Sequence, residues 1–82
     1  MKPWTELSNY IDSFINNKKI STRISTALIR YYWYETRGLS SEEIKNYIIK
    51  KIKESDDIQE FSKIKNLGSY SLNILRKIKE QA

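Results

Sequence analysis

The chain has 82 residues and a formal net charge of +5, with no cysteine and no histidine. The missing cysteines exclude disulfides and thiolate metal sites, and the missing histidines remove the commonest general base and metal ligand. No apolar run approaches the roughly 20 residues that span a bilayer, and the first residues lack the apolar core of a signal peptide. We therefore expect one cytoplasmic domain over residues 1–82 without a cofactor, and the richness in Ile, Lys and Asn favours a bacterial or phage source.

Every segment has helical periodicity, and none alternates as a strand would. The fold class is therefore predicted to be all-α, a compact bundle of about five short helices. The first helix is expected from about Pro3 to Asn16 and the second from Ser21 or Thr22 to about Thr36, where Arg37 and Gly38 follow. Their predicted inner faces are Trp4, Leu7, Ile11 and Phe14 in the first helix, and Ile24, Ala27, Leu28 and Tyr31 in the second.

The second half of the chain predicts three further helices. Ser40 stands three residues before Glu43, which is the capping-box pattern of a helix that should run from Ser41 to about Lys53. A short fourth helix should follow a cap at residues 55–57, and a fifth should run from Ser69 to about Glu80. The residues expected to face inward are Ile44, Tyr47, Ile48 and Ile52 in the third helix, Ile58, Phe61 and Ile64 in the fourth, and Leu72, Leu75 and Ile78 in the fifth.

Charge is distributed unevenly along the chain. Residues 18–37 and 63–82 each carry a net charge of +4, whereas residues 55–62 carry −3. If the two basic blocks meet in space, they form the positive face that is typical of nucleic-acid binders. The alternative is an ordinary lysine-rich solvated surface. The carboxylate pairs at 42–43 and 56–57 stand at predicted helix starts, where anions favour the helix dipole, and nothing else in the sequence indicates an enzyme.

The stretch from Ile64 to Ile78 carries the clearest local signal. It predicts a short helix that ends at Gly68 in a left-handed conformation, a tight turn, and a helix capped by Ser69. The first amides of that second helix would favour an anion such as a phosphate.

Residues 66–72 read Asn-Leu-Gly-Ser-Tyr-Ser-Leu and residues 20–28 read Ile-Ser-Thr-Arg-Ile-Ser-Thr-Ala-Leu. The first segment resembles the helix-hairpin-helix turn, Asn-Leu-Gly-Lys-Lys-Ser-Leu, of the C-terminal domain of the bacterial RNA polymerase α subunit. The second resembles that family's other motif, Leu-Ser-x-Arg-x-x-Asn-x-Leu, and the two occur in the same order. The resemblance covers about residues 18–80, after an N-terminal helix at about 3–16. Thr26, Tyr70 and Ile74 differ from the polar or charged residues that the family has there.

This resemblance implies a non-enzymatic domain that binds the DNA backbone and minor groove and also docks on transcription factors. Arg23 would enter the minor groove, and Gly68 and Ser71 would approach the phosphates. From the residues alone, Lys18, Lys19, Lys63 and Lys65 are further candidates for phosphate contacts, and Ser69 is a cap first and a phosphate contact second. The alternative for Arg23 is a surface ion pair with a nearby carboxylate, which would contribute about 0–1 kcal/mol.

Tyr31-Tyr32-Trp33-Tyr34 is the most unusual run in the sequence. At about 100° per residue the four side chains surround the helix, with Tyr31 inward, Tyr32 and Tyr34 beside it, and Trp33 outward. Three explanations stay open for Trp33: burial under the third helix, contact with a protein partner or a second copy, or stacking on unpaired bases. The leading prediction is a DNA-binding module with little base readout, and the alternative is a protein-interaction adaptor that uses Trp33, Tyr32 and Tyr34.

Overall fold

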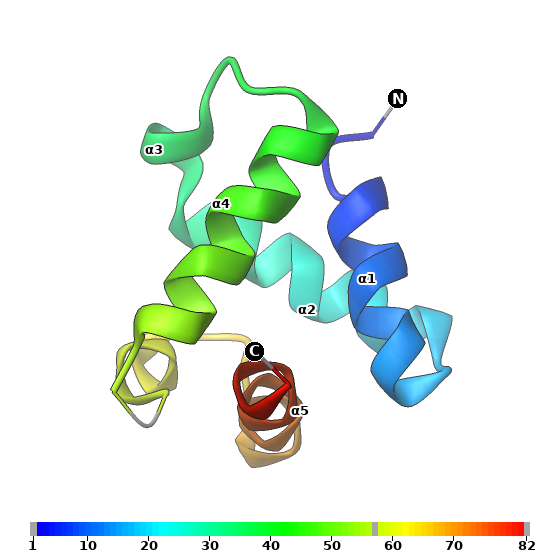
Figure 1. Cartoon of the computed structure of the whole chain (residues 1–82), viewed down its shortest axis with the longest axis vertical. Helices are drawn as coiled ribbons and strands as arrows, with labels where there is room; N and C mark the ends of the chain where they lie inside the picture. Colours follow the sequence, from blue (N-terminus) through cyan, green and yellow to red (C-terminus); the bar gives the residue numbers. More distant parts are fainter. Residues whose placement is uncertain (1, 57, 82) are drawn as a thin grey trace.

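The computed structural model describes residues 2–56 and 58–81, and every regular element in them is helical (Figure 1). The predicted all-α class is confirmed. The elements are α1 (Thr5–Ile15), α2 (Lys18–Tyr31), α3 (Trp33–Thr36), α4 (Ser41–Glu54), the 3-10 helix η1 (Gln59–Lys63) and α5 (Ser69–Glu80).

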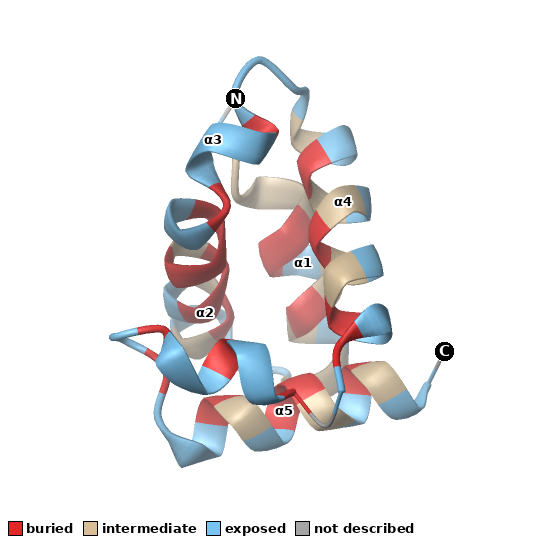
Figure 2. Ribbon diagram, turned by 90° about the vertical axis from the view of Figure 1, so that its left-hand side faces the viewer, coloured by how far each residue is buried: buried red, intermediate tan, exposed pale blue. Residues whose placement is uncertain are grey.

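The longer helices enclose one apolar core. In Figure 1, α1 and α4 lie in front, α2 passes behind them, and α5 is seen nearly end-on at the lower end; in Figure 2, α5 runs across the lower end. Figure 2 shows that the buried positions of these helices face one another across the interior. The fully buried side chains include Leu7, Ile11, Ile24, Leu28, Ile48, Ile52, Phe61, Leu75 and Ile78. The helical periodicity predicts an inward side chain at every one of these positions. Four other positions that it predicts to face inward are only half-buried: Trp4, Phe14, Tyr47 and Leu72.

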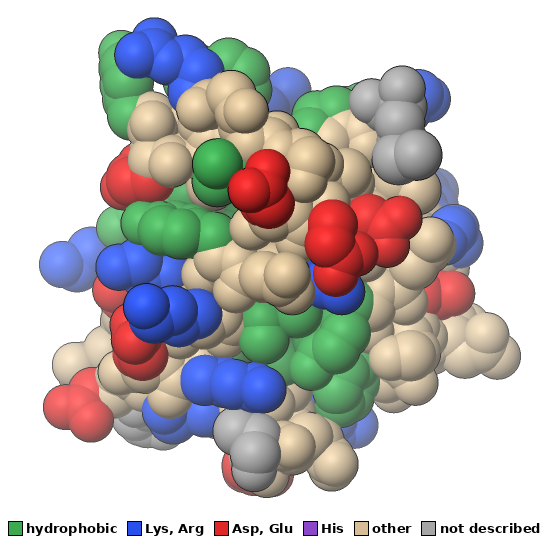
Figure 3. All heavy atoms as spheres, turned by 45° about the horizontal axis from the view of Figure 1, so that its top comes forward, with side chains coloured by type: hydrophobic (Ala, Val, Ile, Leu, Met, Phe, Trp, Pro, Cys, Tyr) green, Lys and Arg blue, Asp and Glu red, His purple; other side chains and the backbone are tan. Residues whose placement is uncertain are grey.

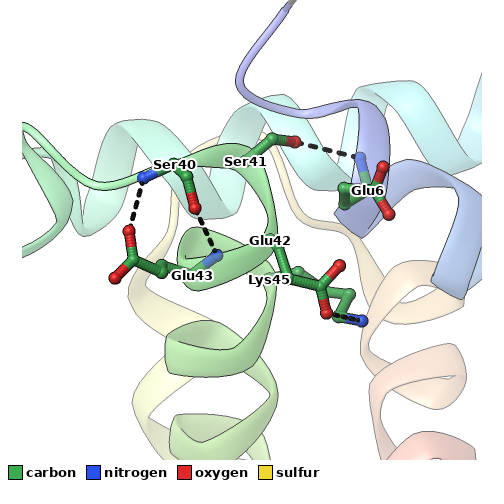
Figure 4. Close-up of polar contacts among 6 residues, drawn as sticks. All are labelled: Glu6, Ser40, Ser41, Glu42, Glu43 and Lys45. Atoms are coloured by element: carbon green, nitrogen blue, oxygen red, sulfur yellow. Dashed lines mark hydrogen bonds and ion pairs between the residues drawn. The ribbon is translucent and has the colours of Figure 1, made fainter.

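The beginning of α4 contains the predicted capping box (Figure 4). The Glu43 amide donates to the Ser40 hydroxyl oxygen at 3.2 Å, and the Ser40 amide donates to Glu43 Oε1 at 2.9 Å. Ser41 connects this end of α4 to the start of α1, because its hydroxyl accepts from the Glu6 amide and donates to the Pro3 carbonyl, both at 3.3 Å. The hydrogen bond from the Ser40 backbone holds the pKa of Glu43 below its ordinary value of 4.5.

This capping box should make stability depend on pH. A carboxyl group whose pKa is lowered by folding stabilises the fold above its unfolded pKa, and that contribution is lost as the pH falls through the folded value. The urea midpoint should therefore decline below about pH 4.5, and the Glu43→Gln variant, which keeps a capping side chain, should show a shallower decline. Glu54→Gln, at the exposed far end of α4, is the matched control. A Glu43→Gln profile parallel to that of the wild type would contradict the prediction.

The second helix begins earlier than predicted. It starts at Lys18 and is capped by Asn17, whose side-chain oxygen accepts from the Ile20 amide at 3.3 Å. Ser21 and Thr22 are therefore not caps but lie inside the helix. Ser21 is fully buried, and its hydroxyl donates to the Asn17 carbonyl and to Asp12. A left-handed Asn16, with φ 50°, turns the chain sharply between α1 and α2.

The prediction that one helix continues to Thr36 is wrong. The helix α2 ends at Tyr31, residue Tyr32 leaves the helical conformation with φ −102° and ψ 26°, and the short α3 follows. This break changes which aromatic ring faces the core: Tyr32 is 3% exposed, whereas Tyr31, predicted to point inward, is 42% exposed. The Tyr32 hydroxyl donates to the Glu60 carboxylate and so joins the end of α2 to η1. Burial, followed by this bond, raises the pKa of Tyr32.

The predicted fourth helix is the 3-10 helix η1. Ser55 acts as expected, because its hydroxyl accepts from the Ile58 amide at 3.1 Å, and Ile58, Phe61 and Ile64 are buried as predicted. Asp57, the last residue of the predicted cap, lies outside the described residues. Ile58 has φ 61°, a conformation that is unfavourable for a β-branched residue. The same residue is 1% exposed, so this strained backbone occurs at a side chain that is packed into the core.

The turn before α5 differs from the prediction. The preceding helix ends at Lys63 rather than at Gly68, and Gly68 has extended backbone angles, φ −88° and ψ −178°. The glycine that does adopt a left-handed conformation is Gly38, with φ 88°. Gly68, not Ser69, is the N-cap of α5, so no side chain caps this helix. The predicted extent of α5 itself is confirmed.

Within the described part of the chain, no helix is long and apolar enough to cross a membrane. The same residues contain no group of acidic side chains with the arrangement of a metal site.

Candidate nucleic-acid interface

A groove runs between α2 and the segment that leads from η1 to α5. It consists of two hollows that share Ala27, Arg30 and Asn66 and are therefore continuous. Figure 2 shows this segment passing beside α2. We call this feature the basic groove; its lining residues are Arg23, Thr26, Ala27, Arg30, Tyr31, Lys63, Ile64, Lys65 and Asn66.

One wall of the basic groove comes from a single stripe of α2. Residues three and four apart lie on the same face of a helix, so Arg23, Thr26 and Arg30 follow one another along it. Lys19, four residues before Arg23, continues the same stripe toward the helix start and is exposed. Thr26 donates its hydroxyl hydrogen to the Thr22 carbonyl at 2.8 Å, which leaves its oxygen able to accept another bond.

The charged residues that line the basic groove are all cationic: Arg23, Arg30, Lys63 and Lys65. Among residues 2–56 and 58–81, none of these four cations forms a salt bridge or a hydrogen bond through its side chain. Arg23 therefore has no carboxylate partner among the described residues, which is evidence against the alternative that it forms a surface ion pair. Four cations around one groove raise the local positive potential, which attracts a polyanion.

One group of acidic side chains lies outside the basic groove. Figure 3 shows them in the middle of the face over the beginnings of α1 and α4. Glu42 is bound there by Lys45, with 2.6 Å between the nitrogen and the carboxylate oxygen.

Lys18 does not belong to the basic groove. Its ammonium group donates to the Asn9 side-chain oxygen, and its neighbours are residues of α1. About 140° of helix rotation separates Lys18 from Arg23, as expected for five residues at 100° each. The predicted group of cations thus divides: Lys19, Arg23 and Lys65 share one side of the molecule and Lys18 faces α1.

The predicted contact residues at the start of α5 differ in exposure. Gly68 and Ser69 are exposed, whereas Ser71 is only 7% exposed, so its side chain is not presented at the surface as a phosphate contact would require. Apart from Gly68 itself and its two chain neighbours, no described atom would lie within 4 Å of a β-carbon placed on Gly68. Neither its backbone angles nor its neighbours within the fold therefore require a glycine at this position.

Two groove residues that the sequence did not single out are Arg30 and Asn66. Arg30 could have been found, because it stands seven residues after Arg23 and helical spacing places both on one face. Asn66 belongs to the turn motif, but its approach to α2 depends on how η1 packs. Tyr31 was missed as a surface residue because the end of α2 at that position is not visible in the periodicity.

The aromatic run ends on a second exposed surface. Trp33 is 51% exposed and Tyr34 is 79% exposed, and Leu39 beyond α3 is also exposed. We call these three residues the α3 patch. The prediction that the third helix buries Trp33 is therefore wrong. Figure 1 shows α3 at one side of the molecule, joined to the beginning of α4 by a long loop. Tyr32, predicted as a partner contact, is instead part of the core.

Comparison of the chain with protein-family models, with curated proteins and with solved structures gave no match.

Proposed function

We propose that this protein is a non-enzymatic module of the helix-hairpin-helix kind that binds duplex DNA, mainly through its phosphate backbone. The observation that carries the proposal is the basic groove, where four cations without partners in the described chain line one hollow surface that includes no carboxylate. Proteins that contact DNA without reading its bases depend on such cations, because each one that neutralises a phosphate releases condensed counterions.

The spacing within the groove suits a duplex. Arg23 and Arg30 are about 10 Å apart along the axis of α2, at 1.5 Å per residue, so they can reach different phosphates of one strand. Arg23 is the residue that the resemblance to the polymerase α C-terminal domain assigns to the minor groove. The narrow minor groove of A-tracts has a negative potential that attracts an arginine side chain. Lys63 and Lys65, on the opposite wall, would bind the adjoining backbone.

The start of α5 would have a smaller part than the resemblance implies. Ile74, where the family has a glutamate, is 3% exposed and belongs to the core. Tyr70 is 59% exposed and brings no positive charge. The backbone amides of the first turn of α5 would donate the remaining hydrogen bonds to the phosphate. The open space at Gly68 would let the phosphate approach them.

The test is a salt titration of duplex DNA binding. Four phosphate contacts predict a slope of about −3.6 for log K against log salt, which is a loss of affinity of about 150-fold between 50 and 200 mM. Arg23→Ala should reduce both the affinity at low salt and the steepness of the slope by about one phosphate contact. Fluorescence anisotropy with a labelled duplex measures both quantities.

The matched control is Lys50→Ala, because Lys50 is exposed on α4 and does not line the basic groove. It should leave the slope nearly unchanged. Absence of binding at low salt, or equal effects of the two substitutions, would exclude the basic groove as the DNA surface.

A protein-interaction adaptor is the second candidate, and the exposed α3 patch favours it. Large aromatic side chains that remain in water commonly mark an interaction surface. The same titration separates the two candidates, because an adaptor that docks through Trp33 and Tyr34 does not need the groove cations for its binding.

A further inference from the structure

The basic groove is not uniform along its length. Its end near the C-terminus of α2 is a hollow of about 280 Å³ in which cations surround apolar and aromatic side chains. Binding a phosphate backbone requires only the cations. The apolar and aromatic side chains of the hollow suit a ligand that has an apolar face as well as a negative charge.

Tyr31 supplies the aromatic wall of this hollow. It is 42% exposed, and its ring meets the Tyr32 ring at 84° with 4.9 Å between the centroids. Such an edge-to-face contact covers at most one face of the Tyr31 ring. Tyr32 is itself fixed by burial and by its bond to Glu60, so it holds Tyr31 in place. Ala27 and Ile64, which are 5% and 8% exposed, form the apolar lining beside it.

Asn66 supplies the polar group. Its side-chain amide has both a donor and an acceptor, it is exposed, and no hydrogen bond of its side chain occurs among the described residues. A side-chain amide can pair with the edge of a base through two hydrogen bonds. Arg30, Lys63 and Lys65 line the same hollow and can bind the phosphate next to that base.

We propose that this hollow binds one unpaired nucleotide of single-stranded DNA, with its base against Tyr31, its edge at Asn66 and its phosphate on Arg30, Lys63 and Lys65. The inference rests on the proposed function and adds a preference for unpaired over paired DNA. A base inside a duplex is stacked on both faces and cannot present one to Tyr31, whereas an unpaired base can stack on an aromatic side chain.

The experiment compares a short single strand with the duplex of the same sequence, at one salt concentration, by fluorescence anisotropy. The wild type should bind the single strand more tightly. Tyr31→Leu should lower single-strand affinity by about 5- to 150-fold, the range of one base-stacking contact. It should lower duplex affinity by a smaller factor, because a paired base cannot stack on the ring, so the preference for the single strand should fall. Tyr31→Phe should keep the wild-type preference, because it retains the ring.

Asn66→Ala is a second variant at an exposed position and should also weaken single-strand binding more than duplex binding. It keeps the test decisive if Tyr31→Leu does not fold. Equal losses on both forms of DNA, or no loss on the single strand, would overturn the inference while the duplex titration still supports the proposed function. Absence of binding to either form would overturn both.

Discussion

Replacing Phe61 by alanine should lower the free energy of unfolding by about 3–5 kcal/mol, the usual range for truncating a fully buried phenylalanine. The Phe61 ring is 0% exposed and lies 6.3 Å from the Tyr32 ring, measured between centroids. A domain of this length is stable by roughly 4–12 kcal/mol, at about 0.05–0.15 kcal/mol per residue. The substitution should therefore remove a large share of the total stability.

Because of where Phe61 lies, its substitution should affect the basic groove as well as the stability of the fold. Phe61 is the only residue of η1 that is buried. Together with the buried residues that flank the helix, Ile58 and Ile64, and the Tyr32–Glu60 hydrogen bond, it attaches this short helix to the core. Lys63 and Lys65 follow within four residues and form one wall of the basic groove. Loosening η1 should consequently weaken nucleic-acid binding as well as stability.

Urea unfolding followed by far-ultraviolet circular dichroism measures the change. Gln59→Ala is the control, because Gln59 is an exposed residue of the same 3-10 helix, and surface substitutions of this kind usually stay within about 0.5 kcal/mol. A Phe61→Ala variant that loses less than about 1 kcal/mol would show that the ring is not the anchor of η1.

The elements that were predictable from the sequence are those defined by local chemistry. The residue at which α4 begins could be predicted from Ser40 and Glu43 alone, because the two residues of a capping box lie within four positions of the sequence. The extent of α5 and the burial of Leu7 and Ile11 in α1 follow from periodicity in the same way. Each of these signals concerns neighbouring residues and does not depend on what the helix packs against.

The errors arise where two local solutions compete. Asn17, Ser21 and Thr22 can all cap a helix, and packing against α1 favours Asn17 because it leaves Ser21 buried beside Asp12. The four aromatic residues at 31–34 give no periodic signal. Tyr32 is the buried one because it packs against Phe61 and Glu60 of η1 and against Tyr47 of α4. Gly68 suggested a left-handed helix end, but the chain leaves η1 several residues earlier and reaches Gly68 in an extended conformation.

The candidate interface was predictable in parts but not as a whole. Arg23 and Lys65 could be named one by one, and the α2 stripe from Lys19 to Arg30 follows from helical spacing. The approach of residues 63–66 to α2 is a tertiary contact between segments about 40 residues apart, and no local pattern specifies it. The hollow at Tyr31 depends on both this contact and the break at Tyr32.

Reversing the charge of Arg30 should have the largest effect on nucleic-acid binding. Among the residues that the structure describes, Arg30 is the one cation that lines both hollows of the basic groove. A hydrogen bond to a charged group contributes about 1.5–3 kcal/mol, so losing the contact alone lowers affinity by about 10- to 150-fold. A glutamate also repels the phosphates, and we therefore expect Arg30→Glu to lose more than about 100-fold in affinity for duplex and single-stranded DNA alike.

Lys50→Glu makes the same change in net charge on α4, outside the basic groove. If binding depends only on the total charge of the chain, the two variants should lose affinity equally. If the basic groove is the binding surface, Arg30→Glu should lose at least tenfold more, because exposed charges farther away than a Debye length of about 10 Å at 0.1 M salt are largely screened. Melting curves of both variants verify that each is folded, since a glutamate near the C-terminus of α2 also opposes the helix dipole. The comparison thus separates a local site from general electrostatic attraction, which the positive charge of the sequence alone cannot do.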